Sequence, residues 1–513
     1  MSDWSHGYNV SLGYTYGFYR EMAPDWLDMC ARMAGFVAPN RGEDGAFRYL
    51  ELGSGQGFGL CLLAAANPDG EFVGVDFNPE HIAHSEELAA AGGLTNIRFI
   101  EGDFSELGAR WPADLGQFDY AAMHGICSWV PATVRDGLVA CLDKALKPGA
   151  LVYNSYNSKP GWISTQPFQH IARRMQIVGG LSGPKALDET VALFDQLMET
   201  NSAIKRALPT LKMRLDSVRT QNRAYLVQEY LHENWSLFWF SQMMDEMSVA
   251  KLSFIGSATI AEQMLPGFLP AALRAPIEAQ TDPILRQEVL DCAINQSFRR
   301  DIMCRGARTS FGRRLDSISG TIIHLIGAPK GDEVKVSTSF GEIKISRENF
   351  APIIEALSDG PATIGDVLAK PVMSGKPVNP IVQNMMLLAH TGILGTGRSK
   401  PCDPAVAQRF NRIVARAVAE GAPYTQLAIP ALGSGIPIND VEAVLLSTYL
   451  ATPTTDFRTL VQPLLTRLAA VGKSFSKDGK ALEGEARDKR AEGVAKDFVE
   501  STLPRLRRMG AIA

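Results

Sequence analysis

The chain has 513 residues, a net charge of −4 and a pI of about 6.1. This length allows about three or four domains, and the charge provides no basic footprint for nucleic acid. No apolar run approaches the ~18 residues of a membrane span, and the N-terminus lacks a signal-peptide pattern. Seven scattered cysteines are typical of reduced thiols and predict no metal site. We therefore expect a cytoplasmic protein that neither binds nucleic acid nor inserts into a membrane.

The segment before the first predicted strand is rich in aromatic residues between Tyr8 and Tyr19. Pro24 is well placed to begin a helix. Aromatic segments of this kind more often form a packed cover than a binding surface. Because a ligand-binding strand follows, the segment is also a candidate lid, in which Tyr16 closes the site from above.

A nucleotide-binding βαβ unit is predicted between Phe47 and Asp76. A short apolar strand is followed by four alternating glycines, an apolar helix and a second strand that ends on the acid. The expected ranges of these elements are 47–52, 60–66 and 72–75. Glycines let the backbone approach a ligand closely, and an acid at this position can accept hydrogen bonds from both ribose hydroxyls.

The spacing of the glycines indicates which nucleotide binds. Dinucleotide enzymes need a glycine or alanine three residues after the second glycine, where this chain has Phe58. The pattern here is E-x-G-x-G-x-G, with Glu51 two residues before Gly53. S-adenosylmethionine carries an ammonium and a sulfonium, which suit a nearby carboxylate. The sequence therefore predicts S-adenosylmethionine rather than NAD, and an ordinary tight turn is the alternative.

Three more strands complete the first half of the predicted sheet, at 96–100, 118–123 and 150–154. Asp103 follows the strand at 96–100, and we expect this acid and the next backbone amide to lie beside the adenine ring. Ligands of open α/β sheets bind beyond the carboxyl ends of the strands. Aromatic and imidazole side chains follow the strands at 118–123 and 150–154. We therefore expect them where the methyl acceptor meets the methyl donor, although each alone could be a buried structural residue. The predicted cofactor-binding residues are Glu51, Gly53, Ser54, Gly55, Gly57, Asp76, Phe77, Asn78, Asp103, Phe104 and His124.

A helical block follows the fifth strand and extends to about residue 250. Two further strand-like runs, 251–256 and 296–304, come after it. We expect both runs to complete the same sheet, with the block inserted over the mouth of the active site. A separate helical domain is the alternative.

Eight segments between Trp4 and Arg305 resemble bacterial class I methyltransferases that carry a methyltransferase regulatory domain. The segments are GYTYGFYREMAP, LELGSGQGFG, GVDFNP, MHGICSWV, SYNSKPGW, QNRAYLVQEYL, KLSFIGSA and NQSFRRDIMCR. The more distant characterised relatives are lysine methyltransferases that modify bacterial outer-membrane proteins. One departure is Gln228, where family members often have histidine, whereas the following Glu229 matches.

The predicted fold is α/β: a Rossmann-like class I methyltransferase sheet with a helical insertion, then winged-helix-like and helical regions. The module at 330–400 combines a hairpin and three helices, and its third helix lacks Arg and Lys, so protein contact or structural support is favoured over DNA binding. Two glycine runs, 395–397 and 433–435, are predicted to be loops. The predicted domain limits are 1–165 for the cofactor domain, 166–250 for the insertion, 251–310 for the rest of the regulatory domain, 330–400 for the module and 401–513 for a C-terminal helical domain.

The first functional hypothesis is methylation of lysine side chains in a bacterial envelope protein. Lysine must first lose a proton, since its free pKa is near 10.4, and His124, Glu229 or bulk water could take it. The predicted catalytic residues are His124, Trp129, Tyr156, Trp162, Tyr16 and Glu229. A methyltransferase for a small molecule or saccharide is the alternative, and a non-catalytic interaction protein that retains a cofactor fold is the second. A protein substrate is expected, and the chain could form a homodimer.

Overall fold

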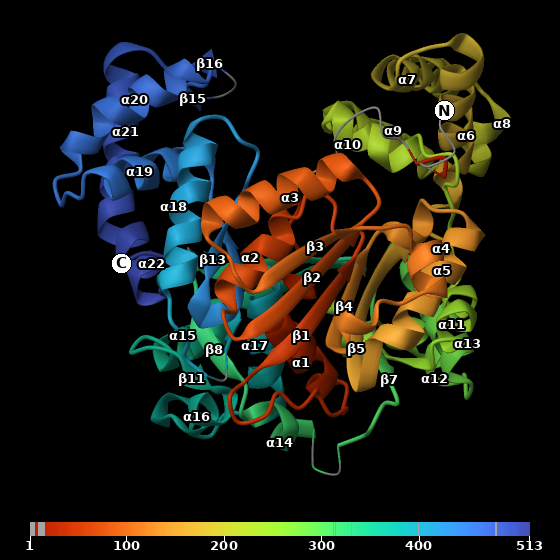
Figure 1. Ribbon diagram of the computed structural model, residues 1–513, viewed down its shortest axis with the longest axis horizontal. Helices are drawn as coiled ribbons and strands as arrows, with labels where there is room; N and C mark the ends of the chain where they lie inside the picture. The colour runs from red at the N-terminus through yellow and green to blue at the C-terminus, as the bar shows by residue number, and fades with distance from the viewer. Residues whose placement is uncertain are drawn as a thin grey trace.

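The computed structural model describes residues 6–8, 16–310, 312, 314–329, 331–398, 400–477 and 480–513. Its centre is a seven-stranded sheet in the order β3-β2-β1-β4-β5-β7-β6 (Figure 1). Strands β1 to β5 pair in parallel, and β7 is antiparallel to both of its neighbours. The strands are β1 Phe47–Leu52, β2 Gly70–Asp76, β3 Ile97–Glu101, β4 Phe118–His124, β5 Leu146–Asn157, β6 Leu252–Ser257 and β7 Phe298–Arg305.

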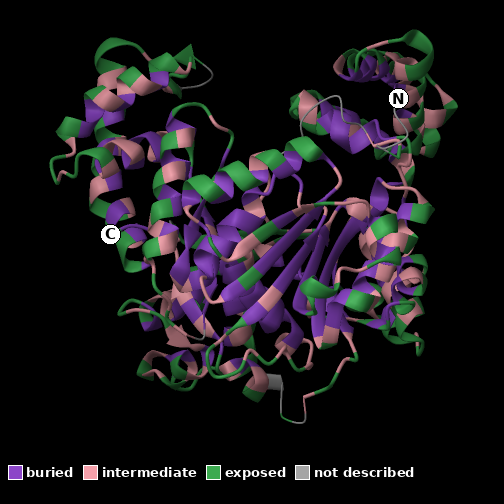
Figure 2. Ribbon diagram, in the orientation of Figure 1, coloured by how far each residue is buried: buried purple, intermediate pink, exposed green. Residues whose placement is uncertain are grey.

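Helices cover both faces of this sheet, which explains why its central strands are mainly apolar. In β1, Tyr49 faces one hydrophobic cluster and Leu50 the other, and both side chains are fully buried. Most of the central sheet is buried (Figure 2). Continuous apolar runs are typical of parallel strands that are buried on two sides. Helices α1 Pro24–Met33, α2 Phe58–Ala66 and α3 Pro79–Gly92 contribute to the first cluster, and α4 Phe104–Ala109, α5 Ala132–Ala145 and α11 Phe240–Ser248 to the second.

The helical block lies between β5 and β6, as predicted, because β6 and β7 pair into the same sheet as β1. Five of its helices have a hydrophobic core of their own and stand beyond one end of the sheet (Figure 1). They are α6 Gln166–Gly179, α7 Gly183–Glu199, α8 Ala203–Ala207, α9 Leu211–Thr220 and α10 Arg223–Tyr230. Helices α12 Ala271–Glu278 and α13 Pro283–Ile294 then connect the last two strands. The predicted fold class is confirmed.

The module after the sheet contains the predicted hairpin and the three predicted helices, preceded by one further helix, with a small three-stranded sheet in the order β11-β8-β12. Its elements are α14 Arg314–Ser319, β8 Ile322–Leu325, β9 Glu333–Thr338, β10 Gly341–Ser346, α15 Arg347–Ala356, β11 Ala362–Thr363, α16 Ile364–Ala369, α17 Val378–Thr391 and β12 Leu394–Gly397. The prediction of a loop at 395–397 is wrong, because these residues pair with β8 as an edge strand.

The C-terminal region is mainly helical but also contains the hairpin of β13 Gln426–Ile429 and β14 Ser434–Pro437. In the second glycine run, 433–435, Gly433 lies in a turn as predicted, whereas Ser434 and Gly435 begin β14, so the prediction of a loop is wrong for these two residues. The helices are α18 Ala405–Ala419, α19 Asp440–Ala451, α20 Arg458–Ala470, α21 Gly484–Asp497 and α22 Leu503–Arg508. Helix α18 packs against α2 and α3, which anchors this region to the nucleotide-binding half.

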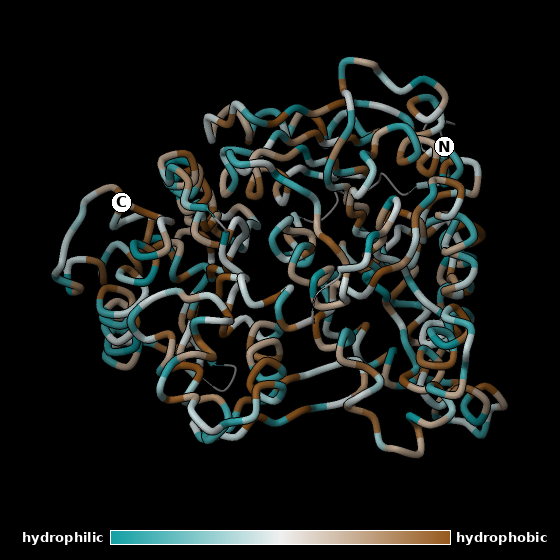
Figure 3. The backbone as a smooth tube through the Cα atoms, turned by 90° about the horizontal axis from the view of Figure 1, so that it is seen from below, coloured by the Kyte–Doolittle hydropathy of each residue, from teal (hydrophilic) through white to brown (hydrophobic). Residues whose placement is uncertain are grey.

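Hydrophobic stretches are short and alternate with hydrophilic ones along the chain (Figure 3). None of the described helices combines the length and the apolar character that a membrane span requires.

Candidate active site

The loop between β1 and α2 is built on glycines with positive φ angles: +77° at Gly53, +53° at Gly55 and +71° at Gly57. A side chain is also excluded by space at two of these positions. A Cβ atom would lie 2.3 Å from Ile126 Cδ1 at Gly53 and 2.2 Å from Ser85 Oγ at Gly57. The glycine pattern thus fixes a tight backbone loop at the start of α2.

Asp76, at the end of β2, holds this loop in place. Its Oδ2 accepts a hydrogen bond from the Gly55 amide at 2.8 Å, and its Oδ1 accepts one from the Asn78 amide at 3.0 Å and lies 3.1 Å from His81 Nδ1. Asn78 also caps α3 by accepting from the Glu80 amide. A carboxylate has about four acceptor positions, so acceptor capacity remains at Asp76 for a ligand hydroxyl.

Glu51 is the least compensated charge beside the loop. The residue is 8% exposed, and its buried Oε2 has no hydrogen-bond partner among the described residues, nor does the neighbouring Ser54 Oγ. Burial, together with the charge of Asp76, raises the pKa of Glu51 to about 8. An unpaired buried carboxylate is costly unless a cation accompanies it. These groups therefore fit the ammonium and sulfonium of S-adenosylmethionine.

Residues 16–19 cover the glycine loop, and a cavity of about 40 Å³ separates the two. Tyr16 packs edge-on against His84 and Tyr424, with ring centroids 5.0 and 5.6 Å apart. Tyr16 lines this cavity over the glycine loop, and its predicted role in closing over the methyl acceptor stays a prediction. Tyr19, three residues after Tyr16 in the same covering segment, also lines the neighbouring cavity between the sheet and the helical insertion.

The ends of β2 and β3 carry the remaining predicted cofactor residues. The Phe77 ring packs edge-on against Tyr8 at 5.6 Å. Asp103 caps α4 through the Ser105 amide at 2.6 Å, and its other oxygen lies 2.5 Å from His6 Nε2. The Phe104 side chain is buried in the core, which leaves its backbone as the group available for the predicted amide contact.

A second cavity, of about 300 Å³, lies between the sheet and the helical insertion. Its walls come from the ends of β4 and β5, from α9 and α10, and from β7. The lining residues are Tyr19, His124, Trp129, Asn157, Trp162, Arg214, Tyr225, Gln228, Glu229, Ser297, Phe298 and Arg300. Tyr19 and His124 also line the cavity at the glycine loop, so the two cavities meet there. We refer to them as the donor cavity and the acceptor pocket.

His124 is held at this junction in its neutral form. Its Nδ1 lies 3.0 Å from both the Tyr153 hydroxyl and Ser155 Oγ, which fixes the plane of the ring. Burial, and then the positive charge of Arg300, lower the pKa of His124 to about 3. An imidazole with this pKa is a weak base near neutral pH.

Glu229 is the titratable carboxylate of the acceptor pocket. Its Oε1 accepts from Asn157 Nδ2 at 3.1 Å, and its Oε2 accepts from the Tyr225 hydroxyl at 3.2 Å. Burial raises the pKa of Glu229 to about 7, although these hydrogen bonds and the charge of Arg214 act in the opposite direction. Glu229 can therefore exchange a proton near neutral pH.

The prediction that Tyr156 lines the acceptor pocket is wrong. Its ring is fully buried in the core on the other face of β5, and its hydroxyl donates to Asp301 Oδ2 at 2.7 Å. Side chains alternate along a strand, so the next residue, Asn157, reaches the pocket instead. This alternation could have identified Asn157 from the sequence.

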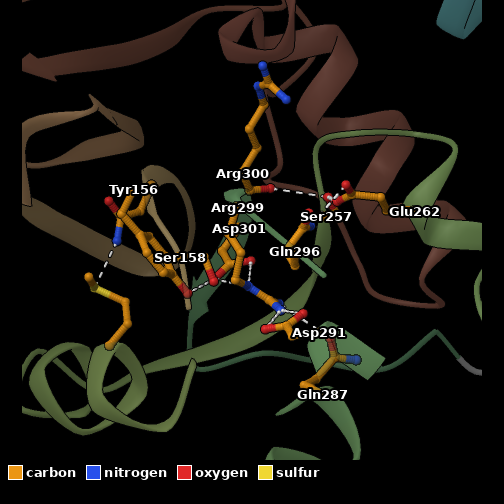
Figure 4. Close-up of polar contacts among 12 residues, drawn as sticks. Tyr156, Ser158, Ser257, Glu262, Gln287, Asp291, Gln296, Arg299, Arg300 and Asp301 are labelled. Carbon is orange, nitrogen blue, oxygen red and sulfur yellow. Dashed lines mark hydrogen bonds and ion pairs between the residues drawn. The ribbon is translucent and has the colours of Figure 1, made fainter. Parts of the chain in front are cut away.

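Tyr156 belongs to a buried polar cluster that joins β5, β7 and α13 (Figure 4). Arg299 Nη1 donates to both carboxylate oxygens of Asp291, at 2.6 and 2.8 Å, and Arg299 Nε donates to Asp301 at 2.9 Å. The next residue, Arg300, extends away from this cluster (Figure 4) and lines the acceptor pocket. Sequence reasoning did not identify Arg300, nor Arg214 and Tyr225 of the insertion, because their positions depend on tertiary packing.

A larger cavity, of about 490 Å³, lies between the edge strands β12 and β14 and is lined by Phe18, Tyr19 and Trp26. It contains none of the residues predicted for the site. The predicted site residues that line a cavity therefore belong to the donor cavity and the acceptor pocket.

Comparisons with known proteins agree with this geometry. Residues 43–208 match the family model of a methyltransferase domain, and residues 222–305 match that of a predicted methyltransferase regulatory domain. The uncharacterized protein sll1526 of Synechocystis is 31% identical over 514 residues, which cover 99% of each chain. An uncharacterized protein of Rickettsia prowazekii is 28% identical over 286 residues, which cover 55% of this chain and 49% of the relative.

Among solved structures, PKMT2 from Rickettsia typhi in complex with AdoHcy has the same fold, with a TM-score of 0.71 and 18% identity over 96% of this chain and 99% of that one. The chain therefore belongs to the S-adenosylmethionine-dependent methyltransferases that carry a methyltransferase regulatory domain, and its cofactor is S-adenosylmethionine.

Proposed function

We propose that this methyltransferase modifies the side-chain amine of lysine in a bacterial envelope protein. The observation that supports the proposal most directly is the acceptor pocket, which meets the donor cavity at Tyr19 and His124 and contains Glu229. The sequence resemblance to lysine methyltransferases of outer-membrane proteins points to the same class of substrate.

The aromatic lining suits an amine that enters neutral and leaves as a cation. Trp129 and Trp162 contribute apolar surface to the wall of the pocket, and a low-dielectric environment lowers the pKa of an amine. Aromatic faces also stabilise a passing ammonium, by about 0.5–2 kcal/mol per contact. The pocket can therefore hold lysine before and after the reaction.

Glu229 is the group that we assign to the proton. S-adenosylmethionine, when bound, supplies a methyl group on a positively charged sulfur. The lysine nitrogen uses its lone pair to form the new bond to carbon, while the carbon–sulfur pair stays with sulfur. Glu229, ionised above a pKa of about 7, accepts the proton that the lysine ammonium must lose. Asn157 and Tyr225 keep its oxygens in place.

The test follows radiolabelled methyl groups from S-adenosylmethionine into a bacterial envelope fraction and maps the labelled side chains by mass spectrometry. Label on lysine, strongly reduced in Glu229→Gln, supports the proposal. The exposed Glu233 of the following loop provides the matched control, Glu233→Gln. Label that enters a small molecule or glycan and no protein would overturn the proposal.

A further inference from the structure

Two arginines line the acceptor pocket, Arg214 from α9 of the insertion and Arg300 from β7 of the sheet. Among the described lining residues, Glu229 is the one carboxylate. Because its pKa is about 7, it cancels at most one of the two positive charges near neutral pH. The pocket is therefore positively charged, which is unexpected for a site that receives lysine.

Arg300 has little compensation from the protein. Its Nη1 donates to Thr259 Oγ1 at 3.3 Å, and its guanidinium carbon lies 4.9 Å from the centre of the Phe298 ring. Its buried Nε has no partner among the described residues, and none of their carboxylates forms an ion pair with it. The adjacent Arg299, by contrast, bonds two carboxylates (Figure 4).

Arg214 is positioned as a second cation above an aromatic ring. Its guanidinium carbon lies 4.1 Å from the centre of the Trp162 ring. Within the part of the chain that the structure describes, no carboxylate lies close enough to form an ion pair with Arg214. Arg214 also bonds the Tyr230 hydroxyl and interacts with the charge of Glu229. Since neither arginine forms an ion pair within the described residues, each guanidinium can still bind a negatively charged group.

A lysine acceptor alone would be repelled by this lining. A carboxylate carried by the same acceptor would relieve the repulsion, since arginine binds carboxylates in a bidentate, charge-assisted geometry. We propose, on the basis of the proposed function, that the preferred acceptor is a lysine with an aspartate or glutamate directly beside it in the sequence, and that Arg300, with Arg214, recognises this acid. Both arginines are specificity-determining residues that do not take part in methyl transfer.

The experiment compares short, end-blocked peptides that contain one lysine flanked by glutamate, by glutamine or by arginine. The wild-type enzyme should prefer the glutamate-flanked peptide over the glutamine-flanked one by about tenfold or more in kcat/KM, the range for a charge-assisted hydrogen bond. In Arg300→Gln this ratio should fall toward one, and Arg300→Lys should recover part of it. In Arg300→Glu the preference should shift to the arginine-flanked peptide. Arg286→Gln, at an exposed position on α13, serves as the control and should keep the wild-type ratio.

Two results would overturn the inference without affecting the proposed function. One is equal methylation of all three peptides by the wild-type enzyme. The other is an unchanged peptide preference in Arg300→Gln together with a large loss of S-adenosylhomocysteine affinity by calorimetry, which would assign Arg300 to the carboxylate of the donor. Failure of the proposed function looks different, because then no lysine peptide is methylated whereas label enters another class of acceptor.

Discussion

The ring of Tyr19 is stacked on the imidazole of His124, with the ring centroids 3.6 Å apart and an interplanar angle of 21°. Tyr19 belongs to the segment that covers the glycine loop, whereas His124 ends β4. The stack therefore connects the cover to the sheet at the point where the donor cavity and the acceptor pocket meet.

Removing the ring of Tyr19 should affect both the methyl donor and the methyl acceptor, because Tyr19 lines both cavities. We expect Tyr19→Ala to lower kcat/KM about five- to tenfold, because an aromatic pair contributes ~0.5–1.5 kcal/mol beyond its buried area. Tyr19→Phe keeps the stack and should stay within about twofold of wild type on the same basis. Steady-state kinetics of the two variants checks this, and equal losses in both would point to the hydroxyl instead.

Donor binding should depend on pH through Glu51. Burial and Asp76 raise the pKa of Glu51 to about 8, so the carboxyl is largely protonated at neutral pH. A cationic ligand favours the ionised form, so binding should release a proton, and affinity should rise with pH until it levels off above about 8. Calorimetry in buffers with different ionisation enthalpies measures the proton release. Glu51→Gln should abolish it.

Asp76→Ala should weaken donor binding by roughly 1.5–3 kcal/mol, the range for hydrogen bonds to a charged group. The loss combines the predicted contact with ribose and the support that Asp76 gives to the Gly55 and Asn78 amides. Calorimetric titration with S-adenosylhomocysteine checks the value. Glu71→Ala, at an exposed position on the same strand, is the control. Wild-type affinity in Asp76→Ala would remove Asp76 from the donor site.

The rate of methyl transfer should rise with pH through a pKa of about 7, because Glu229 accepts a proton only when it is ionised. Below that value we expect about a tenfold increase per pH unit, followed by a plateau. Glu229→Gln should lower kcat about 10²- to 10⁴-fold and remove this limb of the profile. An unchanged profile in Glu229→Gln would assign the proton to another group, including bulk water.

The two neighbouring arginines of β7 should differ sharply in their effect on stability. Arg299→Met leaves Asp291 and Asp301 buried without their cation, a change that typically costs ~3–5 kcal/mol. Arg300→Met disrupts no ion pair within the described structure and should have a much smaller effect. Urea unfolding of the two variants and the wild type provides the comparison, and similar midpoints for both variants would contradict the assignment.

The sequence was most informative where structure depends on local constraints. Residue types and spacing predict the range of β1, the glycines with positive φ angles from Gly53 to Gly57, and the acid that ends β2. The position of the insertion was also predictable, because the run at 251–256 had the composition of a further strand.

The acceptor pocket was only partly predictable, because its lining depends on which side of an element each residue faces. Tyr156 points into the core on the other face of β5. In the segment that covers the glycine loop, Tyr19 rather than Tyr16 contacts His124 beside the acceptor pocket. Arg214 and Arg300 reach the pocket from segments that are distant in the sequence. Neither has a local motif that indicates this.

The position of β7 between β5 and β6 has a consequence for the synthesis of the chain. β5 ends at Asn157, and its partner begins at Phe298, roughly 140 residues later. At translation rates of ~5–20 residues per second, one edge of β5 stays unpaired for about 7–28 s after that strand is made. An open strand edge is a template for aggregation. The ribosome-bound chain must therefore pass through an interval in which chaperones, or the helical insertion itself, keep that edge from pairing with another chain.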